Sequence, residues 1–132
     1  KELFHFIESK RKMSHLKISY SEEGFLGFPH EGQVRTQLYH CIAGVHVGSL
    51  LADGSFSACP SLSPEWIQGH LDQGKFSDTW EKGYGNMRSR DWRKNPSCGN
   101  CHQWKNCEGN SLHLWDWENH QPQLCHYKML KT

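Results

Sequence analysis

Four cysteines in the C-terminal third of the chain have the spacing of a metal site. They are Cys98, Cys101, Cys107 and Cys125, in the order Cys-x2-Cys-x5-Cys with the fourth farther on. Two thiolates separated by two residues can bind one metal from a single tight turn, and Gly99 and Asn100 tolerate the backbone angles of such a turn. The four-thiolate shell suits either structural zinc or a 4Fe–4S cluster. We expect the four sulfurs to converge on one metal-sized point.

Two alternatives to metal binding exist for these cysteines, namely unligated thiols and a disulfide framework. Six cysteines allow 15 disulfide connectivities and would need an oxidising compartment. The sequence has no apolar stretch near the roughly 18 residues of a membrane span, and its N-terminus lacks a signal-peptide core. We therefore expect a cytoplasmic protein, in which thiols stay reduced and clustered cysteines favour metal over disulfides.

The two remaining cysteines, Cys41 and Cys59, lie on either side of a predicted β-hairpin. Strand-like runs at residues 45–51 and 55–59 flank the pair Asp53-Gly54, which is typical of a tight hairpin turn. We expect Cys41 and Cys59 to face each other across this hairpin and to form a possible incomplete second metal site. Two thiolates are half of a four-ligand site, and the alternative is two small buried side chains.

Composition and charge exclude some classes of partner. The chain has 15 basic and 14 acidic residues and a net charge of +1, so no general attraction to nucleic acid or to an anionic membrane is expected. Hydrophobic residues make up 36% of the chain, and many of them are aromatic. A core this small leaves little margin for stability, so bound metal is expected to support the fold.

The elements that would position the cysteines predict an α+β fold. Apolar spacing favours a helix within residues 1–12, alternation favours a strand at residues 15–20, and residues 22–37 have the composition of a connecting loop. Ser63-Pro64 has the residues of a helix start, a second helix is expected at residues 78–87, and a short one after Pro122. The fold class is therefore a β-hairpin with short helices and long loops around one or two metal sites.

These residues together resemble a known family. The pattern Cys41-x12-Gly54-x4-Cys59, followed by the Cys-x2-Cys-x5-Cys run and Cys125, is similar to the SPASM domain. SPASM domains are the C-terminal auxiliary iron–sulfur domains of radical S-adenosylmethionine (SAM) enzymes of the peptide- and protein-maturase type. The resemblance implies a SPASM-like domain at residues 41–132. Residues 1–40 are similar to the last helix and strand of the radical SAM α/β partial barrel with its linker.

The resemblance also implies roles for the cysteines. Cys98, Cys101, Cys107 and Cys125 match the four ligands of the outer auxiliary 4Fe–4S cluster, and Cys41 and Cys59 match two ligands of an inner cluster. The sequence departs from the pattern at Ser111, where the family has a further cysteine, and at Arg35, where some members have one. The inner cluster is therefore expected to be absent, incomplete or completed by another ligand such as Ser111 or a nearby histidine. Histidines also stand beside cysteines at positions 40, 102 and 126, where they could ligate or hydrogen-bond to sulfur.

The function that the resemblance implies is auxiliary-cluster and substrate binding within a radical SAM oxidoreductase that modifies a peptide or protein. The SAM-cleaving chemistry of the family needs a Cys-x3-Cys-x2-Cys loop, which this sequence lacks. We expect that core, and with it SAM, in a domain of the same polypeptide upstream of residue 1, so that the chain alone is not active. The alternative is a zinc-binding structural or protein-interaction module without a redox role, and zinc could also substitute for iron in the same thiolates.

Overall fold

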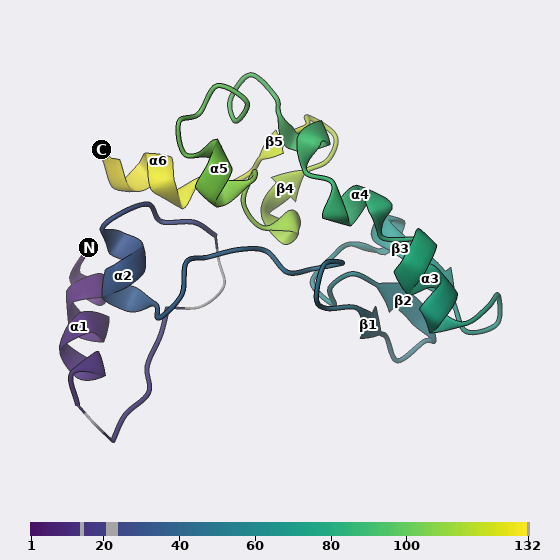
Figure 1. Cartoon of the computed structure of the whole chain (residues 1–132), viewed down its shortest axis with the longest axis horizontal. Coiled ribbons are helices and arrows are strands. Elements are labelled where there is room, and N and C mark those ends of the chain that lie inside the picture. Colours follow the sequence, from purple (N-terminus) through teal and green to yellow (C-terminus); the bar gives the residue numbers. More distant parts are fainter. Residues whose placement is uncertain (14, 21–23, 132) are drawn as a thin grey trace. The chain divides into compact units, whose positions relative to one another are not determined.

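The computed structural model describes residues 1–13, 15–20 and 24–131. Within these ranges the chain is a small α+β domain with six short helices, a three-stranded antiparallel sheet and a separate β-hairpin (Figure 1). Contacts divide the chain into two compact units. The first unit comprises Lys1–Cys41 and Asn95–Thr132, and the second comprises Ile42–Lys94.

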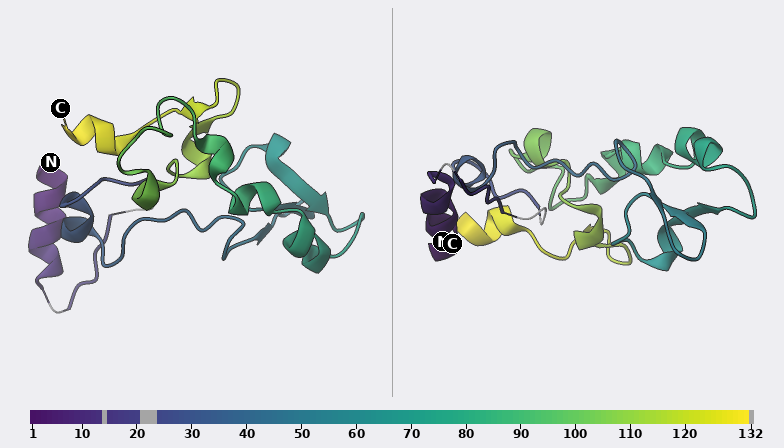
Figure 2. Two further views of the ribbon diagram at one scale, coloured as in Figure 1. Left: turned by 45° about the horizontal axis from the view of Figure 1, so that its top comes forward. Right: turned by 90° about the horizontal axis from the view of Figure 1, so that it is seen from below.

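The N-terminal part of the first unit packs two helices around an apolar core. Helix α1 (Glu2–Arg11) confirms the helix predicted in residues 1–12, and it lies beside α2 (His30–Val34) in both views of Figure 2. The buried side chains of this core come from both helices and from the segment between them. They are Phe4, Ile7, Leu26 and Val34, with Leu130 of the last helix packed against them.

The segment that joins α1 to α2 differs from the sequence prediction in two ways. No strand forms at residues 15–20, although the Tyr20 N–H donates to the Val34 carbonyl at 2.9 Å. The region predicted as a loop from residue 22 to 37 contains α2, and its residues 22 and 23 lie outside the described part of the chain. The physical reason lies outside the helix itself, because the Glu31 carboxylate in α2 accepts the backbone N–H groups of Leu26, five residues before it, and Tyr39, eight residues after it.

The C-terminal part of the first unit consists of short elements. They are α5 (Trp104–Cys107), a 3-10 turn (Leu112–Leu114), β4 (Trp115–Asp116), β5 (Gln121–Pro122) and α6 (His126–Lys131). Strands β4 and β5 pair antiparallel, with Trp115 opposite Pro122. The helix predicted after Pro122 is confirmed by α6.

The second unit is built on a three-stranded antiparallel sheet in the order β1 (Ser49–Leu50), β2 (Ser55–Ser57) and β3 (Ile67–His70). The predicted hairpin is confirmed, since Ser49 pairs with Ser57 across the turn at Asp53-Gly54. Gly54 has a φ of 90°, which favours glycine, and the Asp53 carboxylate accepts the Ser55 N–H at 2.9 Å.

Helices in the second unit are shorter than the sequence suggests. Ser63-Pro64 starts only a 3-10 turn (Pro64–Trp66), because the chain then enters β3 and pairs with β2. The helix predicted at residues 78–87 is divided into α3 (Phe76–Lys82) and α4 (Gly85–Arg88), with a further 3-10 turn at Asp91–Arg93. The division falls at Gly83, whose low helix propensity explains the break. Phe56, Phe76, Trp80 and Tyr84 form the aromatic core of this unit through edge-on and tilted ring contacts.

The observed units do not follow the boundary expected at residues 40 and 41. Residues 1–41 form one compact unit with the last 38 residues of the chain, Asn95–Thr132. The expectation that residues 1–40 derive from a radical SAM barrel, and residues 41–132 from a SPASM-like domain, stays a prediction. Among the described helices, none has the length and apolar character needed to cross a membrane.

Candidate metal centre

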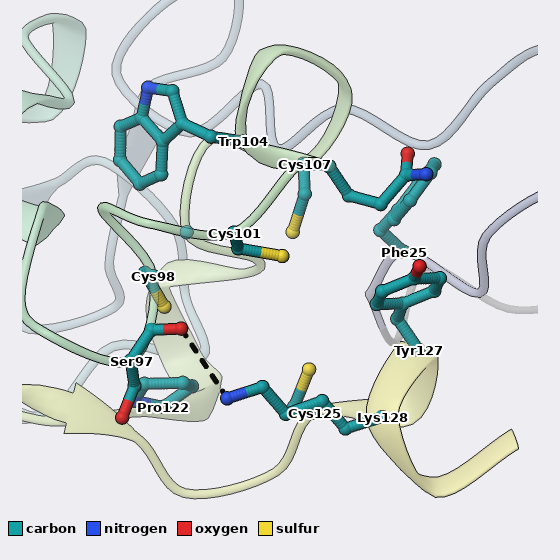
Figure 3. A pocket seen from close by; sticks show the side chains of 12 residues that line it. Phe25, Ser97, Cys98, Cys101, Trp104, Cys107, Pro122, Cys125, Tyr127 and Lys128 are labelled. Atoms are coloured by element: carbon teal, nitrogen blue, oxygen red, sulfur yellow. Dashed lines mark hydrogen bonds between the residues drawn. The ribbon is translucent and has the colours of Figure 1, made fainter. Parts of the chain in front are cut away.

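The four cysteines predicted to bind metal line one pocket of the first unit. Cys98, Cys101, Cys107 and Cys125 are all half-buried and all face this pocket, which encloses about 30 Å³ (Figure 3). By that measure one water molecule needs roughly 10–15 Å³, so the space between the cysteines is larger than a packing defect. None of the six cysteines is in a disulfide. The structure thus brings together four side chains that span 28 positions of the sequence, residues 98–125.

A tight turn presents the first two cysteines, as their spacing predicts. The Asn95 side-chain oxygen accepts the Cys98 N–H at 2.8 Å, and the Cys101 N–H donates to the Cys98 carbonyl at 3.0 Å. The Asn95 amide also donates to the His120 carbonyl at 2.5 Å and so ties this turn to the loop between β4 and β5. Gly99 and Asn100 do not adopt positive φ angles, so their suitability for the turn does not depend on the left-handed region.

The left-handed residues follow Cys107 instead. Cys107 ends α5, and Glu108, Gly109 and Asn110 then have φ angles of 48°, 83° and 75°. The step from the helical Cys107 to the left-handed Glu108 turns successive N–H groups toward one concave side, which favours negative charge. The Gly109 and Asn110 N–H groups hydrogen-bond to the Cys107 sulfur and act to lower its pKa.

Asn110 also joins the parts of the chain that carry the pocket. Its side-chain oxygen accepts the Phe25 N–H at 3.0 Å, and its amide nitrogen donates to the Leu124 carbonyl at 2.9 Å, next to Cys125. Gly24 is required for this contact, because a Cβ there would lie 2.1 Å from the Asn110 side-chain oxygen. Asn110 therefore positions the wall of the pocket, a role that sequence reasoning did not assign because its partners Phe25 and Leu124 are distant in the chain.

Aromatic side chains cover one side of the cysteines. Phe25, Tyr39 and Tyr127 form a buried cluster against which Cys101, Cys107 and Cys125 pack. Figure 3 shows Phe25 and Tyr127 on the far side of the pocket from Cys98. These aromatic residues exclude water from the sulfurs, and sequence reasoning did not assign them because they come from distant segments.

Burial sets the electrostatics of the pocket. The pKa of the Cys107 thiol is raised to about 12, chiefly by burial and also by the neighbouring Cys125 and Cys98, against the lowering effect of the N–H groups of Asn110 and Gly109. A thiolate at this position therefore needs a positive charge close to it, which a bound cation supplies. The donor set fits a thiophilic metal or an iron–sulfur cluster.

The cysteines share the pocket without closing around a point. No group of three or more His, Cys, Asp or Glu within residues 1–13, 15–20 and 24–131 is arranged to hold a single metal ion. Tetrahedral zinc with Zn–S bonds of about 2.3 Å would bring the sulfurs to roughly 3.8 Å from one another. A cubane cluster holds its thiolates farther apart because each binds a different iron. The ligand assignment of the four cysteines stays a prediction.

The structure separates the surroundings of Cys41 and Cys59. Cys41 belongs to the first unit, where it packs against the aromatic cluster of Phe25, Tyr39 and Tyr127. Cys59 belongs to the second unit and follows β2, with its N–H directed to the Ser57 hydroxyl at 3.4 Å. Neither cysteine lies within a strand of the hairpin, so the expectation that they face each other across it stays a prediction.

The positions where the sequence departs from the SPASM pattern do not line the cysteine pocket. Ser111 is fully buried and hydrogen-bonds to the Tyr39 hydroxyl, while Arg35 forms an ion pair with Glu31 at 2.6 Å. Of the histidines beside cysteines, His40 lies 3.5 Å from the Glu108 carboxylate, and His102 hydrogen-bonds to the Tyr127 hydroxyl at 2.6 Å. His126, like the other two, is not among the residues that line the pocket.

Comparisons with protein-family models, with curated proteins and with solved structures give no match to this chain.

Proposed function

We propose that the chain is an iron–sulfur auxiliary-cluster and substrate-binding domain of a radical SAM enzyme that modifies a peptide or protein. The observation that carries the proposal is the single pocket lined by Cys98, Cys101, Cys107 and Cys125. The SPASM-like spacing of the cysteines supports the family assignment, and four half-buried thiols, three of them packed against aromatic side chains, support an iron–sulfur cluster as the bound group. A 4Fe–4S cluster, when bound, supplies one-electron chemistry.

The residues of this chain have definite tasks in that proposal. The four cysteines would hold the group, and the N–H groups of Gly109 and Asn110 stabilise negative charge on the Cys107 sulfur. Phe25 and Tyr127 keep water from one side of the pocket. Hydrogen bonds to sulfur and solvent exclusion are the means by which a protein sets the potential of such a site.

Lys128 adds a positive charge at the rim of the pocket. Its ammonium group donates to the Ser97 carbonyl at 3.4 Å and is exposed to solvent (Figure 3). A cation at the rim of the pocket would favour the more negative, reduced state of a cluster bound there. An approaching anionic peptide group would meet it first, so Lys128 marks the side from which a substrate is proposed to approach.

The zinc-binding module without a redox role is the competing function, and metal loading separates the two. The chain should be incubated anaerobically with iron and sulfide, and in parallel with zinc, followed by gel filtration and metal analysis. The proposal predicts about four irons per chain, by the stoichiometry of the cluster, with visible absorption that bleaches on reduction. One tightly bound zinc with no stable iron would favour the structural module.

Matched variants test whether the pocket is the site. Cys98→Ala should remove most of the iron, and Cys59→Ala should leave it in place, because Cys59 belongs to the other unit. Iron retained in full by Cys98→Ala would contradict the assignment. The SAM-dependent part of the proposal needs a Cys-x3-Cys-x2-Cys motif encoded in the same reading frame, and sequencing the gene upstream of residue 1 tests it.

A further inference from the structure

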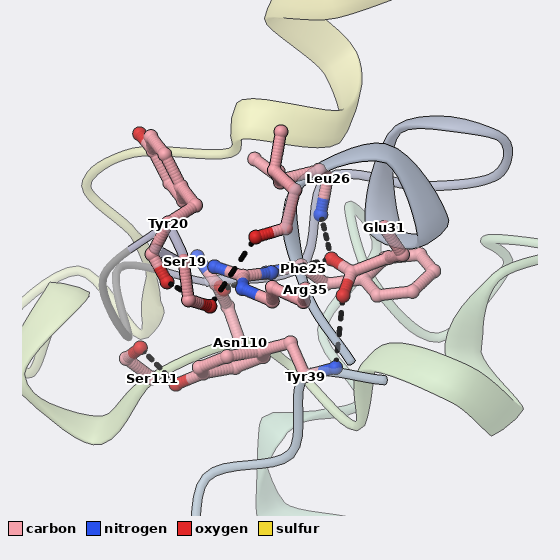
Figure 4. A network of polar contacts seen from close by, with 10 residues as sticks. Ser19, Tyr20, Phe25, Leu26, Glu31, Arg35, Tyr39, Asn110 and Ser111 are labelled. Atoms are coloured by element: carbon pink, nitrogen blue, oxygen red, sulfur yellow. Dashed lines mark hydrogen bonds and ion pairs between the residues drawn. The ribbon is translucent and has the colours of Figure 1, made fainter. Parts of the chain in front are cut away.

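The two positions where this sequence replaces cysteines of the SPASM pattern meet in one buried polar network. Arg35 and Ser111 are far apart in the chain, yet both contact Tyr39 (Figure 4). The Arg35 guanidinium lies 5.0 Å from the centre of the Tyr39 ring, and the Ser111 hydroxyl hydrogen-bonds to the Tyr39 hydroxyl.

Glu31 completes the network. Its carboxylate forms the ion pair with Arg35 at 2.6 Å and accepts the backbone N–H groups of Leu26 at 2.7 Å and Tyr39 at 2.9 Å. Glu31 and Arg35 are 1% and 7% exposed, and Ser111 is 0% exposed. Buried charges are stable in such a place only when they are paired and hydrogen-bonded, and here both conditions are met.

We infer that this chain lacks the second, inner cluster of the SPASM pattern and has this buried hydrogen-bonded network in its place. The inference rests on the proposed function, since it takes the cysteine pattern as SPASM-like. The residues present do not fit a second cluster. Arg35 cannot bind iron, because its guanidinium is a donor without an acceptor atom. The Ser111 hydroxyl is directed to Tyr39 and is a poor ligand at neutral pH, because it resists deprotonation.

The network also has a structural task that a cluster would otherwise perform. Tyr39 belongs to the aromatic cluster with Phe25 and Tyr127, against which Cys41, Cys101, Cys107 and Cys125 pack. Asn110 and Ser111 are consecutive, so the hydrogen bond to Tyr39 anchors the loop that follows Cys107. Through Tyr39, the network of Glu31, Arg35, Tyr39 and Ser111 therefore supports the wall of the cysteine pocket.

Iron stoichiometry tests the exchange. After anaerobic reconstitution of the whole chain with iron and sulfide, we expect about four irons per chain, unchanged in Cys59→Ala and lost in Cys98→Ala. About eight irons, of which half are lost in Cys59→Ala or Cys41→Ala, would overturn the inference while leaving the proposed function intact. Absence of bound iron in the native chain would overturn the proposed function, and the next measurement then decides the inference by itself.

A double-mutant cycle in the chain loaded with the metal that it retains, iron or zinc, tests the network independently of the iron stoichiometry. The urea midpoint of unfolding should fall in Tyr39→Phe and in Ser111→Ala, and the double variant should fall by less than the sum of the two shifts, because both remove the same hydrogen bond. Ser9→Ala is the matched control, since Ser9 is exposed and bonds only locally to the Phe6 carbonyl. Additive shifts for Tyr39→Phe and Ser111→Ala, as for Tyr39→Phe and Ser9→Ala, would overturn the inference.

Discussion

The second unit and the cysteine-bearing segment at residues 95–131 are stabilised in different ways. The second unit has a three-stranded sheet and an aromatic core in which Phe56 and Tyr84 are buried. The cysteine-bearing segment has two-residue strands and helices of four and six residues, and its four cysteines face a common pocket. Elements this short cannot bury enough apolar surface to stabilise themselves. On the proposed function, ligand bonds and buried polar contacts would add to the packing of Leu112, Trp115 and Tyr127 in this segment, whereas the second unit relies on its sheet and aromatic core.

Metal removal should produce the largest difference in stability between the two regions. In chain loaded with metal and then treated with a chelator, backbone amides of residues 95–131 should lose protection from hydrogen exchange, while those of the second unit keep it. Binding to a four-thiolate site is worth on the order of 10 kcal/mol, and much of that is folding free energy. Equal loss in the two regions, or no loss in either, would contradict this account.

Truncation of the aromatic core should destabilise the second unit and leave metal binding unchanged. Phe56→Ala removes a ring that is 1% exposed and contacts the Phe76 ring edge-on at 5.3 Å. A change of this kind costs about 3–5 kcal/mol of unfolding free energy. Urea unfolding followed by tryptophan fluorescence should show the loss, and the metal content should be unchanged.

Leu50→Ala is the control for this substitution, because Leu50 lies opposite Phe56 in the sheet but its side chain is exposed. Its effect should stay within about 0.5 kcal/mol. A loss of bound metal in Phe56→Ala would show that the two units are not stabilised independently.

Asn110 offers a smaller change within the cysteine-bearing segment. Asn110→Ala deletes the bonds to the Phe25 N–H and the Leu124 carbonyl, and it leaves the buried Phe25 N–H without that acceptor. We expect a loss of roughly 2–4 kcal/mol, from orphaned buried groups at about 1–3 kcal/mol each. Calorimetry of the metal-loaded chain measures the stability, and a competition assay should show weaker metal binding.

Asn106→Ala is the matched control, since Asn106 is exposed and its amide hydrogen-bonds to the Gln103 side chain three residues earlier. It should change neither stability nor metal binding measurably. Equal effects of the two asparagine variants would show that the position of Asn110 behind the pocket is unimportant.

The smallest expected effect is the pH dependence of stability that arises from one aspartate in each of the two hairpin turns. Hydrogen bonds from Ser55 lower the pKa of Asp53 below 3.8, and hydrogen bonds from Asn119, chiefly from its side chain, lower that of Asp116 below 3.8. A lowered carboxyl pKa stabilises the folded state above pH 3.8, and this contribution is lost as the pH falls through the lower, folded pKa. The amide NMR shifts of Ser55 and Asn119 should report these titrations, and midpoints at or above 3.8 would contradict the hydrogen bonds.

Local signals in the sequence predicted several elements correctly. Asp53-Gly54 predicted the hairpin, the apolar spacing of residues 1–12 predicted α1, and the Cys-x2-Cys spacing predicted the tight turn at Cys98 and Cys101. Each of these depends on residues close together in the chain. The grouping of the four cysteines in one pocket was predicted from their chemistry, which favours a shared ligand.

Elements that depend on distant contacts were missed. Strand β3 was not predicted, because Ser63-Pro64 indicates a helix start and only pairing with β2 extends the chain after Trp66. Helix α2 lies in a Gly- and Pro-containing segment and is stabilised by the bonds of Glu31 to residues outside it. The network around Tyr39 joins segments 72 positions apart and has no local signature in the sequence.

X-ray absorption at the iron edge tests the central claim most directly. The reconstituted chain should show iron bound to sulfur together with scattering between neighbouring irons, as in a cubane cluster, and both signals should be lost in Cys107→Ala. A thiolate-bound metal without any metal–metal scattering would instead identify a single-ion site and contradict the account. Iron–iron scattering that persists in Cys107→Ala would contradict the assignment of the pocket.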